Sequence, residues 1–165
     1  MASASDLTYE IWSDGACAKN TSGAGGYAAV LVARRSDGSF AEQWDVVGGE
    51  EETTNNRMEL MAVIAGLRAL PASAHVCIFI DSTYVMENFK EQLERWQGND
   101  WRTADGKEVK NRALWEQLST EVADRKVDWV RVPGHAGVPL NKRADKLACA
   151  QRDAYAKRSR RRPVE

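Results

Sequence analysis

A chain of 165 residues with 43% hydrophobic residues is long enough to bury one sizeable core, so we expect a single domain. No apolar run approaches the roughly 20 residues that cross a bilayer, and the N-terminus lacks the basic and apolar regions of a signal peptide, which excludes a membrane-spanning protein and predicts a soluble one. The formal net charge of −1 excludes a chain that is strongly basic throughout, as a dedicated nucleic-acid binder would be.

The charge is nevertheless divided unevenly along the chain. Residues 1–125 carry 12 Lys and Arg against 20 Asp and Glu, whereas residues 126–165 carry 11 against 4. The C-terminal part is therefore suited to face a polyanion. We expect residues 157–165 to form a basic, disordered tail, residues 1–6 a short N-terminal extension, and residues 7–156 the folded domain.

Cysteine usage points to a reducing compartment. The three cysteines, Cys17, Cys77 and Cys149, are far apart and form no Cys-x-x-Cys pair. Neither a disulfide framework nor a zinc site is indicated, so a cytoplasmic location fits best.

The first predicted strand is the β-prone run from Thr8 to Ser13, which is expected to stop at Asp14 and Gly15. Because side chains alternate along a strand, Ile11 and Ser13 face one side of it and Asp14 faces the other. An Asp-Gly pair after a strand is also a common hairpin turn, so by itself it indicates no more than a turn.

The next elements predict an antiparallel meander. Residues 15–26 are rich in glycine but lack the Gly-Lys-Ser/Thr ending of a phosphate-binding loop, so we expect a turn there. Strands are expected at 27–33 and 40–47, joined by a hairpin turn at 36–39, and Gly48-Gly49 should then break the pattern. Such short links pair neighbouring strands antiparallel.

Helices and strands alternate in the rest of the chain. Asn55 or Asn56 can cap a helix that runs to Leu70. The remaining expected elements are a strand at 76–80, helices at 83–96 and 112–123, a strand at 127–132, a loop at 133–139 and a helix at 141–157. Strands joined through helical crossovers should be parallel. This order predicts an α/β fold: a mixed five-stranded sheet, three antiparallel strands followed by two parallel strands, with helices on both faces.

Four acids occupy comparable places in these elements. Asp14 and Asp81 end the first and fourth strands, and if those strands are parallel neighbours both carboxylates reach the same edge of the sheet. Glu59 and Asp145 are expected in the first turns of their helices, where the helix dipole favours the ionised form. Each acid taken singly has an ordinary explanation as a cap, a turn residue or a complement to a dipole.

Together the four acids indicate a metal site. Converging carboxylates repel one another unless a cation neutralises them. Oxygen ligands without cysteine select Mg²⁺ or Mn²⁺, and two ions about 4 Å apart can hold the attacking and leaving oxygens of a phosphodiester displacement. His135, in a loop flanked by Gly134 and Gly137, is suited to proton transfer or product release near the metals.

Five motifs carry a resemblance to a known family, and they appear in its order: Asp14-Gly15-Ala16-Cys17, Thr54-Asn55-Asn56-Arg57-Met58-Glu59-Leu60, Asp81-Ser82-Thr83-Tyr84-Val85, Pro133-Gly134-His135-Ala136-Gly137 and Asn141-Lys142-Arg143-Ala144-Asp145. The chain resembles the bacterial-type type 1 ribonucleases H. The resemblance implies the ribonuclease H fold, with a catalytic domain at residues 7–156. It also implies hydrolysis of the RNA strand of RNA–DNA hybrids by a two-metal-ion mechanism, leaving 5′-phosphate and 3′-hydroxyl ends, with two Mg²⁺ per site and Mn²⁺ as a substitute. A monomer with little base preference is expected.

The same resemblance implies roles for individual residues. The metal ligands would be Asp14, Glu59, Asp81 and Asp145, and His135 would be the mobile proton-transfer group. Contacts to the hybrid are implied for Cys17, Asn20, Thr54, Asn55, Asn56 and Thr83. Thr83 departs from the family pattern, since many relatives carry Gln there. The segment at 97–100 is neutral to acidic where lysine-rich relatives have a basic protrusion, so weaker hybrid binding with a shallower salt dependence is expected.

Other interpretations remain open at this point. An integrase-like enzyme of the same fold would share the acids but not Asn-Asn-Arg-Met-Glu-Leu together with Gly-His-Ala-Gly, and a reverse transcriptase fragment is disfavoured by the complete motif set. A non-catalytic hybrid-binding module should have lost one of the four acids. A bare structural domain would use them as caps and turns. Trp96 and Trp115, at helical positions, are expected to pack in the core instead of stacking on bases.

Overall fold

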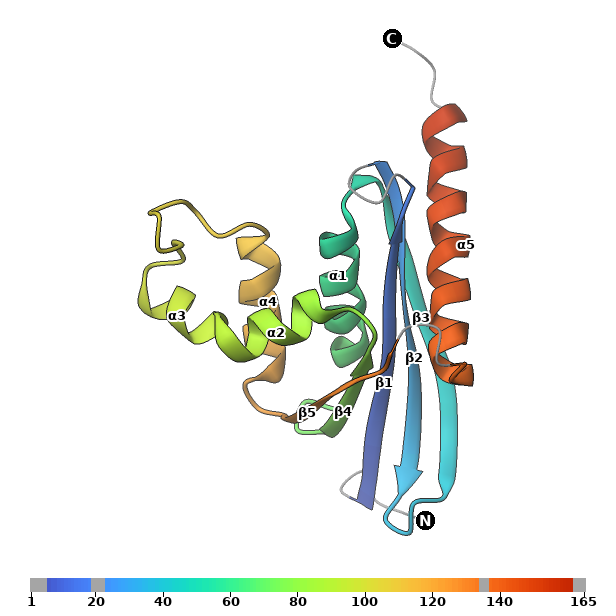
Figure 1. Ribbon diagram of the computed structural model, residues 1–165. Helices are drawn as coiled ribbons and strands as arrows, with labels where there is room; N and C mark the ends of the chain where they lie inside the picture. Colours follow the sequence, from blue (N-terminus) through green and yellow to red (C-terminus); the bar gives the residue numbers. More distant parts are fainter. Residues whose placement is uncertain (1–5, 19–22, 134–136, 162–165) are drawn as a thin grey trace.

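The structure is a computed structural model that describes residues 6–18, 23–133 and 137–161 (Figure 1). Its elements follow in the order β1 (Leu7–Cys17), β2 (Gly23–Arg35), β3 (Phe40–Thr53), α1 (Asn55–Arg68), β4 (His75–Ile80), α2 (Thr83–Glu91), α3 (Leu93–Gly98), α4 (Arg112–Val122), β5 (Lys126–Arg131) and α5 (Pro139–Arg161). None of the helices within these described ranges is long and apolar enough to cross a membrane.

The strands form one sheet in the order β3-β2-β1-β4-β5. β1 pairs antiparallel with β2, and β2 with β3, whereas β4 pairs parallel with both β1 and β5. The predicted mixed sheet is therefore confirmed. β1 lies at its centre, where the antiparallel half meets the parallel half. Along β1, Ile11 and Ser13 are buried and Trp12 and Asp14 are half-buried, as the alternation predicted.

Two strands are longer than predicted. β1 continues past Asp14 and Gly15 to Cys17, because β2 begins at Gly23 and supplies backbone partners to the end of β1. β3 likewise stays paired with β2 through Gly48 and Gly49 and ends only at Thr53. The predicted turn was thus wrong for residues 15–17 and 23–26, and the predicted break at Gly48 was wrong as well.

Helices cover both faces of the sheet, as predicted. Figure 1 shows α1 against one face with α4 outside it, and α5 along the opposite face. The core on the α1 face is made of large apolar side chains that are fully buried, among them Ile11, Leu31, Leu60, Leu118 and Trp115. The ring of Trp96 meets that of Trp115 edge-on at 5.4 Å, so both tryptophans pack as expected.

One predicted helix divides into two. The helix expected at 83–96 ends at Glu91 and resumes as α3 at Leu93, with Gln92 between them at a φ of −116°, outside the usual helical range. Ser82 caps α2 by accepting a hydrogen bond from the backbone N–H of Tyr84.

The α5 face is built from small residues. Ala16 and Ala28 of the sheet pack with Ala148 of α5 in a cluster of their own. Such a surface lets the helix backbone lie close to the strands. α5 spans Pro139–Arg161, longer at both ends than the predicted 141–157, so residues 157–161 are helical and the expectation of a disordered tail was wrong for them. Residues 162–165 lie outside the described residues.

Gly26 is where this close approach is tightest. A methyl group added at Gly26 would overlap the carbonyl oxygen of Ala148 and the backbone nitrogen of Arg152. Because these are backbone atoms that cannot rotate away, Gly26→Ala should lower the free energy of unfolding by about 3 kcal/mol. Urea unfolding measures this, with Gly98→Ala as the control, since nothing lies within 4 Å of an added Cβ there. Equal stability of the two variants would contradict the close packing of α5.

Candidate active site

Asp14 and Asp81 lie at the same end of the two central strands. The parallel pairing of β1 with β4 finishes at Ser13 and Ile80, and each acid is the next residue along its own strand. The expected meeting of two carboxylates at one edge of the sheet is therefore borne out by the register. Asp14 Oδ1 also accepts a hydrogen bond of 2.8 Å from the backbone N–H of Gly15.

Glu59 reaches this region from α1. The helix begins after Thr54, whose Oγ1 accepts a hydrogen bond from the backbone N–H of Arg57. The buried face of α1 packs against the sheet, and it includes Met58, the residue before Glu59. Gly15 permits the contact, since a Cβ there would stand 2.7 Å from the backbone nitrogen of Glu59. Because residue 15 has no side chain, α1 can lie close enough to place Glu59 beside the end of β1.

Ser82 holds the Glu59 carboxylate. Its hydroxyl donates a hydrogen bond of 2.6 Å to Glu59 Oε2 while it accepts the capping bond from the backbone of α2. Ser82 was not among the predicted site residues, and the alternative in which Asp81 caps the helix was wrong, since the cap is Ser82. An N-cap serine directly after a strand-end acid is the only sequence signal that could have indicated this position.

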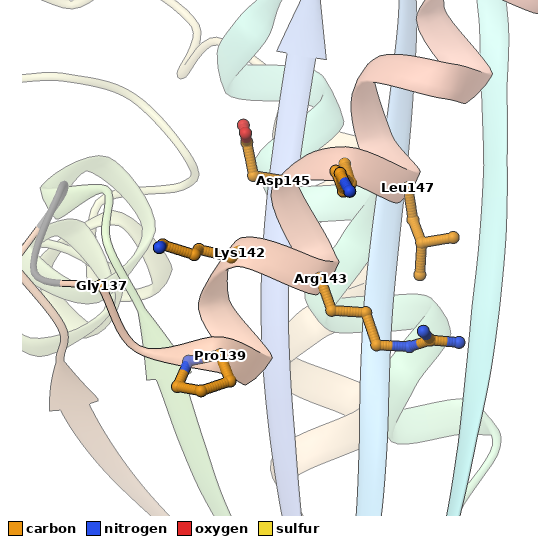
Figure 2. A pocket seen from close by; sticks show the side chains of 7 residues that line it. Gly137, Pro139, Lys142, Arg143, Asp145 and Leu147 are labelled. Atoms are coloured by element: carbon orange, nitrogen blue, oxygen red, sulfur yellow. The ribbon is translucent and has the colours of Figure 1, made fainter.

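Asp145 comes from α5, on the opposite face of the sheet from α1. Its neighbours Ala144 and Ala148 are buried, whereas its own side chain is exposed at a pocket of about 760 Å³ (Figure 2). In Figure 2 Lys142 projects toward the Gly137 end of the pocket, and Arg143 extends the other way, toward β3. One turn after Asp145, the thiol of Cys149 lies 3.8 Å from Asp145 Oδ1.

The helix positions of two acids differ from the expectation. α1 begins at Asn55 and α5 at Pro139, and neither has an acid in its first turn. Glu59 and Asp145 therefore belong to the second turns. The predicted stabilisation of their charges by the helix dipoles was wrong, because that effect is confined to the first turn.

Burial and mutual repulsion act on these carboxyls instead. Burial, with the nearby charges of Asp81 and Asp145 adding to it, raises the pKa of Asp14 to about 8, against the opposing hydrogen bond from Gly15. Burial, together with the charge of Asp81, raises the pKa of Glu59 to about 7, although the Ser82 hydroxyl acts in the opposite direction. The charge of Asp81 thus raises the pKa of both Asp14 and Glu59.

The donor set is made of carboxylate oxygens. Among the described residues, no three His, Cys, Asp or Glu side chains converge closely enough to hold a metal ion as they stand. Asp14 nevertheless interacts electrostatically with Asp81 and Asp145, and Glu59 interacts with Asp81. Half-buried oxygen ligands that are costly to ionise without a counter-charge are the chemistry that suits a hard divalent cation.

The residues expected to touch a hybrid lie in different surroundings. Thr54 and Asn56 are exposed at the start of α1, and Asn55 and Thr83 are half-buried. Cys17 is buried, with its thiol directed at the carbonyl oxygens of Thr53 and Gly23 at 3.6 and 3.8 Å, so its side chain is not presented to a ligand. Asn20 and His135 lie outside the described residues.

A groove of about 320 Å³ begins at Asn56 and runs between α2 and the segment before α4. Its lining combines aromatic, amide, basic and acidic side chains, among them Tyr84, Asn88, Trp96, Lys107, Lys110, Asp105 and Glu108. The sequence showed these lysines near one another but gave no indication that they share a groove with Asn56.

Comparisons with known proteins agree with this architecture. The family model described as RNase H matches residues 6–153. A curated relative, Ribonuclease H of Bordetella pertussis, is 49% identical over 139 residues, which cover 84% of this chain and 85% of the relative. Among solved structures, LC9-RNase H1, described as a type 1 RNase H with the type 2 active-site motif, superposes with a TM-score of 0.79 at 28% identity, over 90% of this chain and 73% of that one. LC11-RNase H1, solved in complex with an RNA/DNA hybrid, shares the fold with a TM-score of 0.61 at 21% identity, over 89% of this chain and 98% of that one.

The fold and the sequence relatives thus define a nuclease of the hydrolase class. The chain belongs to the ribonuclease H family.

Proposed function

We propose that this protein is an endonuclease that hydrolyses the RNA strand of RNA–DNA hybrids, leaving 5′-phosphate and 3′-hydroxyl ends. The observation that carries the proposal is the parallel register of β1 and β4, which brings Asp14 and Asp81 to the same end of the two strands. There burial and the charges of Asp81 and Asp145 raise the pKa of Asp14. Membership of the ribonuclease H family supports the substrate, and a relative of the same fold was solved with a hybrid bound.

The four acids Asp14, Glu59, Asp81 and Asp145 would hold two Mg²⁺, with Mn²⁺ as a substitute. Divalent cations at such a site supply Lewis acidity that polarises water and stabilises the charge that develops on the leaving oxygen. The chain's own contribution is to present the carboxyls of Asp14, Glu59 and Asp81 half-buried and that of Asp145 exposed. Asp14 and Glu59, whose pKa values are raised, would release their protons when the cation enters. Ser82 keeps Glu59 turned toward the site through its 2.6 Å hydrogen bond.

Recognition of the hybrid would rest on shape and on the sugar edges. The start of α1 presents Thr54 and Asn56 to solvent. The groove that begins at Asn56 offers amide groups and two lysines, Lys107 and Lys110, for a phosphate backbone, although Asp105 and Glu108 also line it. A hybrid displays 2′-hydroxyls in a shallow minor groove, so contacts of this kind distinguish its strands without reading bases. Asn20 would join these contacts, and His135 would transfer a proton near the scissile bond.

We infer a cytoplasmic monomer. The three cysteines are free, which suits a reducing compartment. Within the described residues the large exposed apolar side chains are Phe40, Val47 and Val130, and they are divided between two strands at opposite edges of the sheet, so they form no single association surface. Sedimentation velocity at micromolar concentration should give a single species near 18.3 kDa.

The proposed end chemistry is tested by mapping both products of a hybrid cut at one site. Fragments carrying 5′-phosphates should ligate to an acceptor without prior phosphorylation, and the 3′-hydroxyl fragments should be extended by a polymerase. A 2′,3′-cyclic phosphate would show that the 2′-hydroxyl is the nucleophile, and a 3′-phosphate with a 5′-hydroxyl would show that the 5′-oxygen is the leaving group. Either product would contradict the proposed hydrolysis.

Replacing Ser82 by Ala should weaken catalysis in a pH-dependent manner. The hydroxyl lowers the pKa of Glu59, so its loss raises that pKa further and leaves less carboxylate at neutral pH. We expect cleavage to fall about fivefold at pH 7 and to recover most of that loss at pH 9, while Ser82→Thr stays near the parent at both.

Ser82 also caps α2, and loss of the cap alone costs about 1 kcal/mol of stability. The pH profile separates the two roles. A deficit of equal size at pH 7 and pH 9 would assign Ser82 to the helix only.

A further inference from the structure

The exposed face of α5 carries more positive charge than the proposed site accounts for. Lysines and arginines occur on this helix at Lys142, Arg143, Lys146, Arg152, Lys157, Arg158, Arg160 and Arg161. Three of them have partners. Arg143 pairs with Asp45, Arg152 pairs with Asp153, and the guanidinium of Arg158 lies 4.6 Å from the centre of the Tyr155 ring.

The other five cations form what we call the basic stripe: Lys142, Lys146, Lys157, Arg160 and Arg161. All five are exposed, and within the described residues none lies at ion-pair distance from a carboxylate. Lys142 and Lys146 are one turn apart, Lys157 stands three turns further along, and the arginines follow within the next turn. The buried residues Asn141, Ala144 and Ala148 face the sheet, so the stripe faces solvent.

The stripe starts at the site and leads away from it. Lys142 and Lys146 line the pocket that also contains Asp145. At 1.5 Å of rise per residue, Arg160 lies about 22 Å along the axis from Asp145, a length that spans roughly six or seven nucleotides of one strand. Figure 1 shows the end of α5 running past the end of the sheet, with no other helix or strand of the described residues beside it. The family match ends at residue 153, so the far half of the stripe lies beyond it.

Charge and composition favour a nucleic acid over a membrane as the partner. The last turns, residues 156–161, contain no large apolar side chain, only alanine, serine and basic residues. An interfacial membrane helix needs an exposed apolar face as well as a basic one, and α5 lays its apolar face on the sheet. A row of unpaired cations along one exposed side of a helix fits phosphates instead.

We propose that the basic stripe of α5 is a second binding surface for the phosphate backbone of the hybrid, beyond the nucleotides that the carboxylate site itself reaches. This inference rests on the proposed function. In this proposal the C-terminal turns of α5 bind the distant part of long hybrids. The affinity for a hybrid should therefore depend on its length, which a site confined to the four acids would not produce.

The test compares two double variants of equal charge change. Lys157→Gln/Arg160→Gln removes two cations of the stripe. Arg35→Gln/Lys126→Gln removes two exposed cations from the opposite end of the sheet, at the residues paired with Leu7 and His75. Binding is measured in an Asp81→Asn background, so that the hybrid is not consumed, with a 10-bp and a 30-bp hybrid over a series of salt concentrations.

The stripe variant should bind the 30-bp hybrid about tenfold more weakly at 0.1 M salt, with a salt slope shallower by about 1.8, close to 0.9 for each lost phosphate contact. Its affinity for the 10-bp hybrid should stay within twofold, because such a duplex extends only about 17 Å to either side of its centre. The control variant should match the parent on both hybrids.

An unchanged salt slope for binding of the 30-bp hybrid by the stripe variant would overturn the proposal. The proposal would also be overturned if the parent bound phosphatidylserine vesicles and the stripe variant lost that binding but kept its affinity for the hybrid. Cleavage of the 10-bp hybrid, with Asp81 intact, separates the two proposals. If that hybrid is cut while the slope is unchanged, only the stripe fails. If neither hybrid is bound or cut, the proposed function fails with it.

Discussion

Replacing Asp14 with Asn should reduce cleavage of an RNA–DNA hybrid by at least about a thousandfold while hybrid affinity stays within about threefold. Asp14 lies on the central strand and interacts with both Asp81 and Asp145, so its oxygens are the ones that link the two sides of the site. A neutral amide of the same size keeps the fold but removes the negative charge that a divalent cation requires.

Asp128→Asn is the matched control for this variant. Asp128 is also a strand aspartate, but it lies on β5 opposite Cys77 of β4, and its carboxylate pairs with His75 at the end of β4 that is far from the site. It should leave the cleavage rate unchanged. Cleavage by Asp14→Asn within tenfold of the parent would show that Asp14 is not a ligand and that the site must be assigned to other residues.

The stability of the metal-free protein should fall as pH rises from 5.5 to 8. The folded-state pKa of Asp14 is raised to about 8 and that of Glu59 to about 7, above the values near 4 that these groups have in an unfolded chain. In this window the unfolded chain has already released protons that the folded chain retains. Rising pH therefore favours unfolding, and the contribution of each group is lost as pH passes its folded pKa.

Mg²⁺ should counteract this loss. Because the cation competes with the retained protons, a saturating concentration should raise the Tm more at pH 8 than at pH 5.5. Asp14→Asn should raise the metal-free stability at pH 8, on the order of 1–3 kcal/mol, and should flatten the pH dependence. Differential scanning fluorimetry at the two pH values measures both effects. A Tm that is independent of pH, with the same Mg²⁺ shift at each, would contradict the raised pKa values of Asp14 and Glu59.

The sequence predicted which segments form strands, because apolar patterning decides which segments enter a sheet. The ends of the strands were less predictable, since they depend on backbone pairing with the neighbouring strand and not on composition. Gly15 and Gly48 resemble breaks, yet both stay in strands because β2 is long enough to supply hydrogen bonds opposite them. In the same way, residues 157–161 look like a charged tail, but they continue the long helix α5.

Some features of the candidate site could likewise be predicted from the sequence, and others could not. Asp14 and Asp81 were predictable, since parallel neighbours bring strand ends together whatever the details of packing. The role of Ser82 was not, because its hydrogen bond to Glu59 depends on how closely α1 approaches β1 over Gly15. The raised pKa values of Asp14 and Glu59 also come from burial that a linear pattern does not show.

The most direct measurement is cleavage of an end-labelled RNA–DNA hybrid with Mg²⁺ and with a chelator, beside double-stranded RNA, single-stranded RNA and duplex DNA, for the parent and for Asp81→Asn. We expect Mg²⁺-dependent cutting of the RNA strand of the hybrid alone, and its loss in Asp81→Asn. A parent protein that binds the hybrid but leaves it intact with either Mg²⁺ or Mn²⁺ would contradict the proposed hydrolysis and would identify a hybrid-binding module instead.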